Sequence, residues 1–167
     1  MNGRVDDFAL AELAAEVGRR LLRARRRLAT AESCTGGWIG KCLTDIPGSS
    51  GWFERGFVTY SDAAKTSMLG VQQATLDMHG AVSEATAREM AEGALSHSEA
   101  QVSVAVTGIA GPTGGTKDKP VGLVWIAWAF PGLEIGAKSF LFDGDRDKIR
   151  RSSVFEALAG LRDRIDG

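Results

Sequence analysis

A long apolar run over residues 121–130 restricts the fold more than any other stretch of the chain. It reads Val-Gly-Leu-Val-Trp-Ile-Ala-Trp-Ala-Phe. A strand with one face in water alternates apolar and polar residues, whereas a strand buried on both faces is apolar throughout. The run therefore predicts an internal strand in a sheet that is covered on both faces.

The elements around this strand alternate between helix and strand early in the chain. Apolar spacing and capping residues predict helices over residues 6–26, 38–45, 61–70, 83–95 and 145–165, with a short helix or turn over 72–79. Short apolar or alternating runs predict strands over residues 28–32, 52–60 and 102–106, and residues 135–142 pair back on the long apolar run as a late hairpin. This order predicts a three-layer α/β/α sandwich with a mixed, mostly parallel sheet and a late antiparallel hairpin. With no linker or repeat in view, we expect a single domain over residues 1–167.

Charge and cysteine content narrow the classes of function. The net charge of −1 argues against a general nucleic-acid binder, and the arginines of residues 19–27 are typical of a solvated helix end. Two cysteines, Cys34 and Cys42, make neither a disulfide framework nor a metal site. No leader sequence or membrane-spanning run is visible, so we expect a cytoplasmic protein with no membrane partner.

The turn Ala31-Glu32-Ser33-Cys34-Thr35-Gly36-Gly37 joins a strand to a helix. Turns built from small residues leave backbone N–H groups unpaired, and these suit an anion or a developing oxyanion. The Ser33 hydroxyl has two interpretations, as a nucleophile or as the cap of the following helix.

A second glycine-rich loop, Thr107-Gly108-Ile109-Ala110-Gly111-Pro112-Thr113-Gly114-Gly115-Thr116, also follows a strand. It matches neither the P-loop nor the dinucleotide-binding fingerprint. Ligands of open α/β sheets bind beyond the carboxyl ends of strands, and glycines let a backbone approach a phosphate or a ring closely. A mobile surface loop is the alternative.

Lys65 falls on the first turns of the helix that begins at Ser61-Asp62. The positive field of a helix N-terminus disfavours a cation, so this position favours a neutral amine that could act as a general base. An exposed lysine is the plainer interpretation. His79 and His97 lack partners for a Ser–His–Asp arrangement, so a serine nucleophile here would depend on a lysine base.

Arg146 and Arg150 lie one turn apart at the start of the final helix. They share a face and could clamp a phosphate. Pairing with Asp143, Asp145 or Asp147 is the alternative.

Taken together, three motifs resemble the CinA C-terminal domain family: residues 31–37, Thr59-Tyr60-Ser61-Asp62-Ala63-Ala64-Lys65, and residues 106–116. Residues 119–122 and Gly144-Asp145-Arg146 with Ile149-Arg150 follow the same pattern in the same order. The resemblance extends from about residue 8 to residue 165. Asp62-Ala63-Ala64 departs from the Asn-Glu-x that commonly precedes the lysine in this family.

The resemblance implies a nicotinamide-nucleotide amidase that converts nicotinamide mononucleotide to nicotinate mononucleotide and ammonia. It implies Ser33 as nucleophile, Lys65 as base and Tyr60 beside them, without a metal or an organic cofactor. It also implies that Arg146 or Arg150 and the loop of residues 107–116 bind the nucleotide substrate. We assign substrate contacts to Cys34, Thr35, Gly36, Gly37, Thr107, Gly108, Gly111, Gly114, Gly115, Arg146 and Arg150. We expect the stand-alone form, without the molybdopterin-binding-like domain of longer members.

The sequence allows three other functions. The chain could be a non-catalytic nucleotide-binding module tied to competence or DNA damage, an amidase for another amide, or a DNA-binding partner that uses its arginine run. The sequence also leaves open whether the chain forms a homo-oligomer, either a dimer or a trimer. The tryptophans could contribute to such an interface or to the core.

Overall fold

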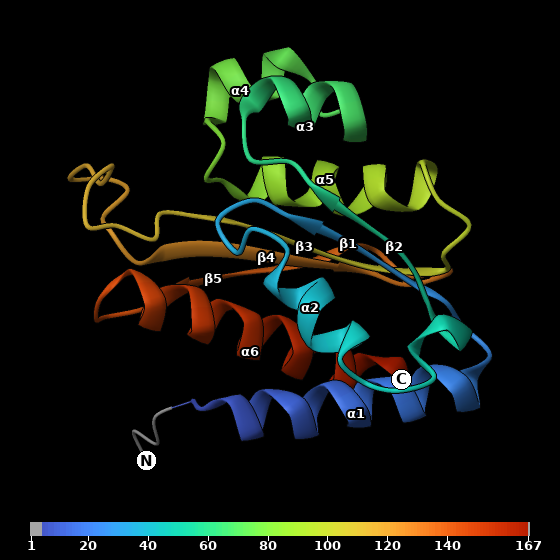
Figure 1. Cartoon of the computed structure of the whole chain (residues 1–167). Coiled ribbons are helices and arrows are strands. Elements are labelled where there is room, and N and C mark those ends of the chain that lie inside the picture. The colour runs from blue at the N-terminus through green and yellow to red at the C-terminus, as the bar shows by residue number, and fades with distance from the viewer. Residues whose placement is uncertain (1–4, 167) are drawn as a thin grey trace.

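A five-stranded mixed sheet forms the middle layer of the structure, a computed structural model that describes residues 5–166 (Figure 1). The strands are β1 (Leu28–Glu32), β2 (Phe53–Val58), β3 (Val102–Gly108), β4 (Leu123–Ala129) and β5 (Gly136–Leu141). They lie in the order β2-β1-β3-β4-β5. The pairs β1–β2 and β1–β3 are parallel, whereas β3–β4 and β4–β5 are antiparallel. The mixed sheet with a late hairpin is therefore confirmed. The expectation of a mostly parallel sheet is wrong, because two of the four strand pairs are antiparallel: β4 pairs antiparallel with β3 as well as with β5.

Helices cover both faces of this sheet. The helices are α1 (Asp7–Ala24), α2 (Trp38–Thr44), α3 (Asp62–Leu69), α4 (Gln73–His79), α5 (Glu84–Ser96) and α6 (Arg146–Ile165), with a 3-10 turn over Ser49–Gly51. In Figure 1, α1, α2 and α6 lie on one side of the sheet and α3, α4 and α5 on the other. This arrangement confirms the three-layer α/β/α sandwich.

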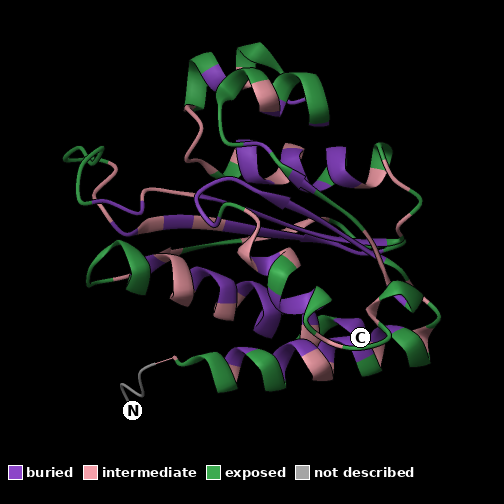
Figure 2. Cartoon of the chain, in the orientation of Figure 1, coloured by how far each residue is buried: buried purple, intermediate pink, exposed green. Residues whose placement is uncertain are grey.

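Strand β4 shows why a sheet with two covered faces follows from the sequence. Val124, Ile126 and Trp128 belong to the core under α1 and α6, while Ala127 and Ala129 belong to the core under α5. Successive side chains of a strand point to opposite faces, so both faces need apolar residues here. Figure 2 shows the central strands and the inward sides of the helices as buried.

Side-chain caps fix four of the helix starts as the sequence predicted. Their oxygen atoms accept from backbone N–H groups three residues on, as an N-cap does. The bonds are Asp6 to Ala9 (2.8 Å), Ser61 to Ala64 (3.0 Å), Ser83 to Thr86 (3.2 Å) and Asp145 to Lys148 (2.8 Å).

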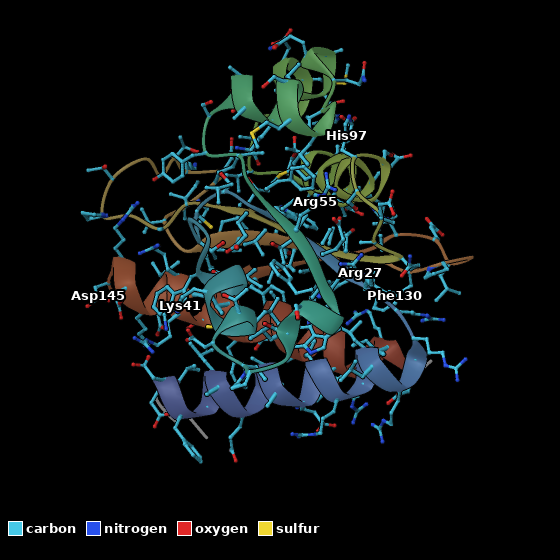
Figure 3. All side chains as sticks on the ribbon, turned by 45° about the vertical axis from the view of Figure 1, so that its right-hand side comes forward. Arg27, Lys41, Arg55, His97, Phe130 and Asp145 are labelled. Atoms are coloured by element: carbon cyan, nitrogen blue, oxygen red, sulfur yellow. The ribbon has the colours of Figure 1, made fainter. Side chains whose placement is uncertain are left out.

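Strand β2 is shorter than the predicted run of residues 52–60. Trp52 lies before it, is only 2% exposed, and packs against Gly18 of α1, where a Cβ would come within 2.6 Å of the indole. At the other end, Thr59 and Tyr60 leave the strand toward α3. Arg55 within β2 donates to the His97 carbonyl at 3.1 Å and ties this edge strand to the end of α5 (Figure 3).

Candidate active site

Ser33, Thr59 and Thr107 form one row across the carboxyl ends of β1, β2 and β3. Glu32 is in register with Val58 on one side and Val106 on the other, so the next residue along each chain reaches the same edge. The Ser33 N–H donates to the Val106 carbonyl at 3.0 Å, and the Thr59 N–H donates to the Glu32 carbonyl at 2.9 Å. The parallel strands thus bring three distant segments to one place, where open α/β sheets bind ligands.

Lys65 reaches Ser33 from α3. Its Nζ lies 3.0 Å from the Ser33 Oγ, and the side chain of Lys65 is only 1% exposed. Two backbone carbonyls also accept from this nitrogen, that of Thr59 at 2.9 Å and that of Tyr60 at 3.4 Å. A buried lysine whose Nζ contacts a serine hydroxyl is the arrangement that a Ser–Lys nucleophile and base need.

These contacts suit a neutral amine. A neutral amine has two N–H groups and one lone pair, so the carbonyls of Thr59 and Tyr60 can take both N–H groups. The lone pair is then left for the Ser33 hydroxyl proton, which is what a general base requires. An ammonium at the same place would use all three N–H groups as donors and have no lone pair.

Burial lowers the pKa of Lys65 below its ordinary value of 10.5. Desolvation disfavours the charged amine, while the negative charge of Asp62 at the start of α3 acts in the opposite direction. Lys65 forms no salt bridge within residues 5–166, so no carboxylate in direct contact compensates for the loss of hydration. Asp62-Ala63-Ala64, which differs from the common Asn-Glu-x of the family, thus places the charge of Asp62 near Lys65, and the contact between Lys65 and Ser33 is kept.

Ser33 does not cap α2. The cap residue is Gly37, which has φ of 98° and offers no side-chain bond, and Gly36 before it has φ of 61°. Both values lie in the left-handed region, where glycine carries no Cβ penalty. The turn thus leaves the Ser33 hydroxyl to Lys65, and the interpretation of Ser33 as a helix cap is wrong for this structure.

The carboxylate of Glu32 takes over the capping of α2. Its Oε1 accepts from the Ile39 N–H at 2.8 Å and from the Thr35 hydroxyl at 2.7 Å, and its Oε2 accepts from the Gly40 N–H at 3.0 Å. Glu32 is 1% exposed, and burial raises its pKa while these hydrogen bonds act to lower it. Sequence reasoning missed this role, although a glutamate directly after a buried strand is itself a signal, because a buried carboxyl needs partners.

Exchanging this carboxylate for an amide tests the role of Glu32. In Glu32→Gln one oxygen becomes an NH2 that cannot accept from the Gly40 N–H, so a buried donor loses its partner. We expect the free energy of unfolding to fall by about 1–3 kcal/mol, measured by urea denaturation. The matched exchange Glu92→Gln, at an exposed position of α5, should change it by less than about 0.5 kcal/mol. Equal stability of the two variants would contradict the role.

A cavity of about 280 Å3 opens beside Ser33. Its lining combines Ser33 and Tyr60 with six of the predicted substrate-binding residues: Cys34, Thr107, Gly108, Gly111, Gly114 and Arg146. The Thr107 hydroxyl donates to the Ala81 carbonyl at 2.8 Å, so it also anchors the cavity wall. The loop of residues 107–116 thus faces the candidate nucleophile.

Arg146 joins the walls of this cavity. Its guanidinium donates to the Gly111 carbonyl at 2.8 Å and to the Tyr60 hydroxyl at 3.0 Å. It forms no salt bridge to Asp143, Asp145 or Asp147, because Asp145 caps α6, Asp143 pairs with Lys148 and Asp147 pairs with Arg151. A guanidinium has five N–H donors, and these two bonds leave others for an anion.

The remaining predicted substrate-binding residues lie outside this lining. Thr35, Gly36, Gly37 and Arg150 border a neighbouring groove of about 540 Å3 between α1, α2 and α6. Lys41, labelled on α2 in Figure 3, lines the same groove. Gly115 packs against Val121, where a Cβ would come within 2.7 Å of the Val121 nitrogen. The structure therefore brings together one part of the predicted set and separates the other from Ser33.

Cys34, next to Ser33, is not a competing nucleophile. Burial raises the pKa of its thiol to about 12, and the thiolate is the reactive form. Across residues 5–166 no three His, Cys, Asp or Glu side chains are grouped as metal ligands would be, and no helix there has the length and apolarity to cross a membrane.

The chain is similar to known proteins over nearly its whole length. The model of a family described as CinA C-terminal domain matches residues 10–165. A curated relative from Escherichia coli, named nicotinamide-nucleotide amidohydrolase PncC, is 51% identical, with 93% of this chain and 94% of the relative covered. A Pseudomonas putida protein of the same name is 48% identical, with 89% and 92% covered.

A solved structure agrees with these sequence matches. The competence/damage inducible protein CihA from Agrobacterium tumefaciens has a TM-score of 0.92 and 43% identity, with all of both chains covered. A family model that spans residues 10–165, together with relatives near 50% identity, settles the family. The chain belongs to the CinA C-terminal domain family.

Proposed function

We propose that this chain is a nicotinamide-nucleotide amidohydrolase that converts nicotinamide mononucleotide to nicotinate mononucleotide and ammonia through an acyl-enzyme on Ser33. The observation that carries the proposal is the 3.0 Å contact between the buried amine of Lys65 and the hydroxyl of Ser33, a residue that lines a cavity. The names of the relatives near 50% identity support the choice of substrate.

The first half of the reaction forms an ester. Neutral Lys65 takes the hydroxyl proton of Ser33 while the Ser33 oxygen attacks the carboxamide carbon. The carbonyl oxygen becomes an oxyanion, which a backbone N–H of the turn stabilises. Lys65 then gives its proton to the amide nitrogen, the C–N bond breaks, and ammonia leaves. Lys65 is neutral again at the end of this half.

The second half returns the enzyme to its starting state. Lys65 takes a proton from water, and the resulting hydroxide attacks the ester carbon. The Ser33 oxygen leaves and receives the proton from Lys65. Tyr60 lies beside them: its carbonyl accepts from the Lys65 amine, and the residue also lines the cavity.

The Cys34 N–H is the oxyanion donor that best fits the turn. The Gly36 N–H is already bonded to the Ser33 carbonyl at 3.0 Å, and Thr35 is fully buried. Within residues 5–166 the Cys34 N–H donates to no backbone carbonyl outside the helices and strands, and Cys34 borders the cavity. A donor on the residue after the nucleophile is also the arrangement of nucleophile elbows in other hydrolases.

Incubation with nicotinamide mononucleotide tests the proposed function. We expect equimolar ammonia and nicotinate mononucleotide, measured by an ammonia-coupled assay and by chromatography. Binding of the nucleotide without release of ammonia would instead favour a non-catalytic nucleotide-binding module. Release of ammonia only from another amide would keep the chemistry and replace the substrate.

Arg146 is the side chain that we assign to the substrate phosphate. In Arg146→Gln we expect KM for nicotinamide mononucleotide to rise about tenfold or more with a smaller change in kcat, because a charge-assisted contact is lost in the ground state and transition state alike. Nicotinamide riboside lacks the phosphate, so its kcat/KM should hardly respond to the same substitution. Equal losses for both substrates would contradict this assignment.

A further inference from the structure

Arg150 contacts the turn that carries Ser33 from the side of the groove between α1, α2 and α6, which we call the outer side; the inner side faces the cavity at Ser33. Its Nε donates to the Cys34 carbonyl at 3.0 Å, and its Nη2 donates to the Thr35 carbonyl at 3.1 Å. Its guanidinium also lies 5.4 Å from the ring centre of Trp38, the first residue of α2. One side chain of α6 thus holds two consecutive carbonyls and the helix that follows them.

We propose that Arg150 is a positioning residue that fixes the turn whose N–H group binds the oxyanion, and that Arg150 does not bind the substrate. This inference rests on the proposed function. Arg150 borders the groove behind the turn, whereas the cavity at Ser33 is lined by Arg146. The two arginines that look equivalent in the sequence therefore have different tasks, one on each side of the turn.

Peptide geometry explains how hydrogen bonds to the carbonyls of the turn control the direction of its N–H groups. A trans peptide is planar, and its C=O points opposite to the N–H of the next residue. The bond from Arg150 to the Cys34 carbonyl therefore fixes the Cys34–Thr35 peptide plane, and the bond to the Thr35 carbonyl fixes the plane that includes the Gly36 N–H. That N–H in turn donates to the Ser33 carbonyl, which sets the plane of the Cys34 N–H.

The turn is held from two sides. Glu32 binds the Thr35 hydroxyl and the start of α2 from inside, while Arg150 binds the Cys34 and Thr35 carbonyls from outside. Gly36 makes room for this, since a Cβ there would lie 3.3 Å from the Arg150 Nη2. A donor that is already in place when charge develops stabilises the transition state most strongly.

A lysine cannot replace this arginine fully. The fork of a guanidinium reaches two carbonyls in fixed geometry, whereas an ammonium is a single point of charge on a flexible chain. Arg151 offers a matched control, because it also lies over Trp38, at 4.8 Å from the ring centre, but bonds to Asp7 and Asp147. It touches none of the carbonyls of the turn within residues 5–166.

The test compares Arg150→Gln, Arg150→Lys and Arg151→Gln by kinetics on nicotinamide mononucleotide and by amide hydrogen exchange. We expect Arg150→Gln to lower kcat about 100-fold with KM within about threefold of wild type. The kcat of Arg150→Lys should lie between those of Arg150→Gln and wild type. Exchange of the Gly36 amide proton should accelerate about tenfold in Arg150→Gln. Arg151→Gln should leave kcat and this exchange rate within about twofold of wild type.

A rise in KM at unchanged kcat in Arg150→Gln would overturn the inference and make Arg150 a substrate ligand, as would unchanged exchange at Gly36. If wild type releases no ammonia, the proposed function fails, and the exchange measurement still decides whether Arg150 holds the turn. Should Arg150→Gln not fold, Arg150→Lys carries both measurements, and wild-type values for it overturn the inference.

Discussion

Lys65→Met should lower kcat for ammonia release about 10^4- to 10^6-fold, the range seen when other hydrolases lose their base. Methionine has nearly the length of lysine and fills the same buried volume, so the fold should survive. What disappears is the amine 3.0 Å from the Ser33 oxygen, which the proposed mechanism uses as the general base. Steady-state kinetics on nicotinamide mononucleotide measure this loss, and a kcat within tenfold of wild type would contradict the role of Lys65.

The same substitution has a signature in stability against pH. The pKa of Lys65 is lowered in the folded state, so between that pKa and the ordinary 10.5 the unfolded chain binds more protons. Stability linked to Lys65 therefore rises with pH through this window, by about 1.4 kcal/mol for each unit of lowering. Lys65→Met should lack this rise in urea denaturation curves. In wild type, kcat/KM should likewise increase with pH as Lys65 loses its proton, with a midpoint below 10.5.

Ser33→Ala should abolish ammonia release to a similar degree while nucleotide binding persists. In the proposed mechanism the serine supplies the oxygen that forms the ester, and the neighbouring Cys34 cannot replace it, because burial raises the pKa of its thiol and keeps it protonated. The structural cost is small, since within the described part of the chain the Ser33 side chain makes one bond, to Lys65, and Lys65 keeps the Thr59 carbonyl as a partner. We expect a loss of about 1 kcal/mol in the free energy of unfolding.

The exposed Ser96→Ala on α5 is the matched control for this exchange. It should retain wild-type kcat, because among residues 5–166 its hydroxyl bonds only to the Glu92 carbonyl of its own helix. Isothermal titration with nicotinamide mononucleotide separates binding from turnover in Ser33→Ala. Full turnover by Ser33→Ala would exclude the acyl-enzyme, whereas loss of binding would mean that Ser33 contributes mainly to holding the substrate.

The fold could be predicted because its main determinants are local patterns. The apolar run that becomes β4 requires two covered faces, and the caps Asp6, Ser61, Ser83 and Asp145 mark the helix starts within a residue. The parallel strands then carry Ser33 and the loop of residues 107–116 to one edge. At Lys65 the sequence alone leaves two interpretations open, an exposed lysine and a neutral amine near a helix N-terminus, and the family resemblance implies the role of base.

The parts that could not be predicted depend on tertiary contacts. The spacing of Arg146 and Arg150 does not show that these two residues of α6 line different sites. Arg146 lines the cavity at Ser33, and Arg150 lines the groove between α1, α2 and α6. The capping role of Glu32 does not follow from the local pattern either, because its carboxylate accepts from N–H groups seven and eight residues further along the chain, beyond the range of an ordinary helix cap. Such assignments need the relative position of elements, which periodicity does not contain.

A double-mutant cycle on kcat tests the central claim most directly. Ammonia release from nicotinamide mononucleotide is measured for wild type, Ser33→Ala, Lys65→Met and the double variant. If the two side chains act as one nucleophile and base, the double variant loses no more than either single variant, within about threefold. Losses that multiply, or a single variant with wild-type turnover, would contradict a Ser33–Lys65 mechanism.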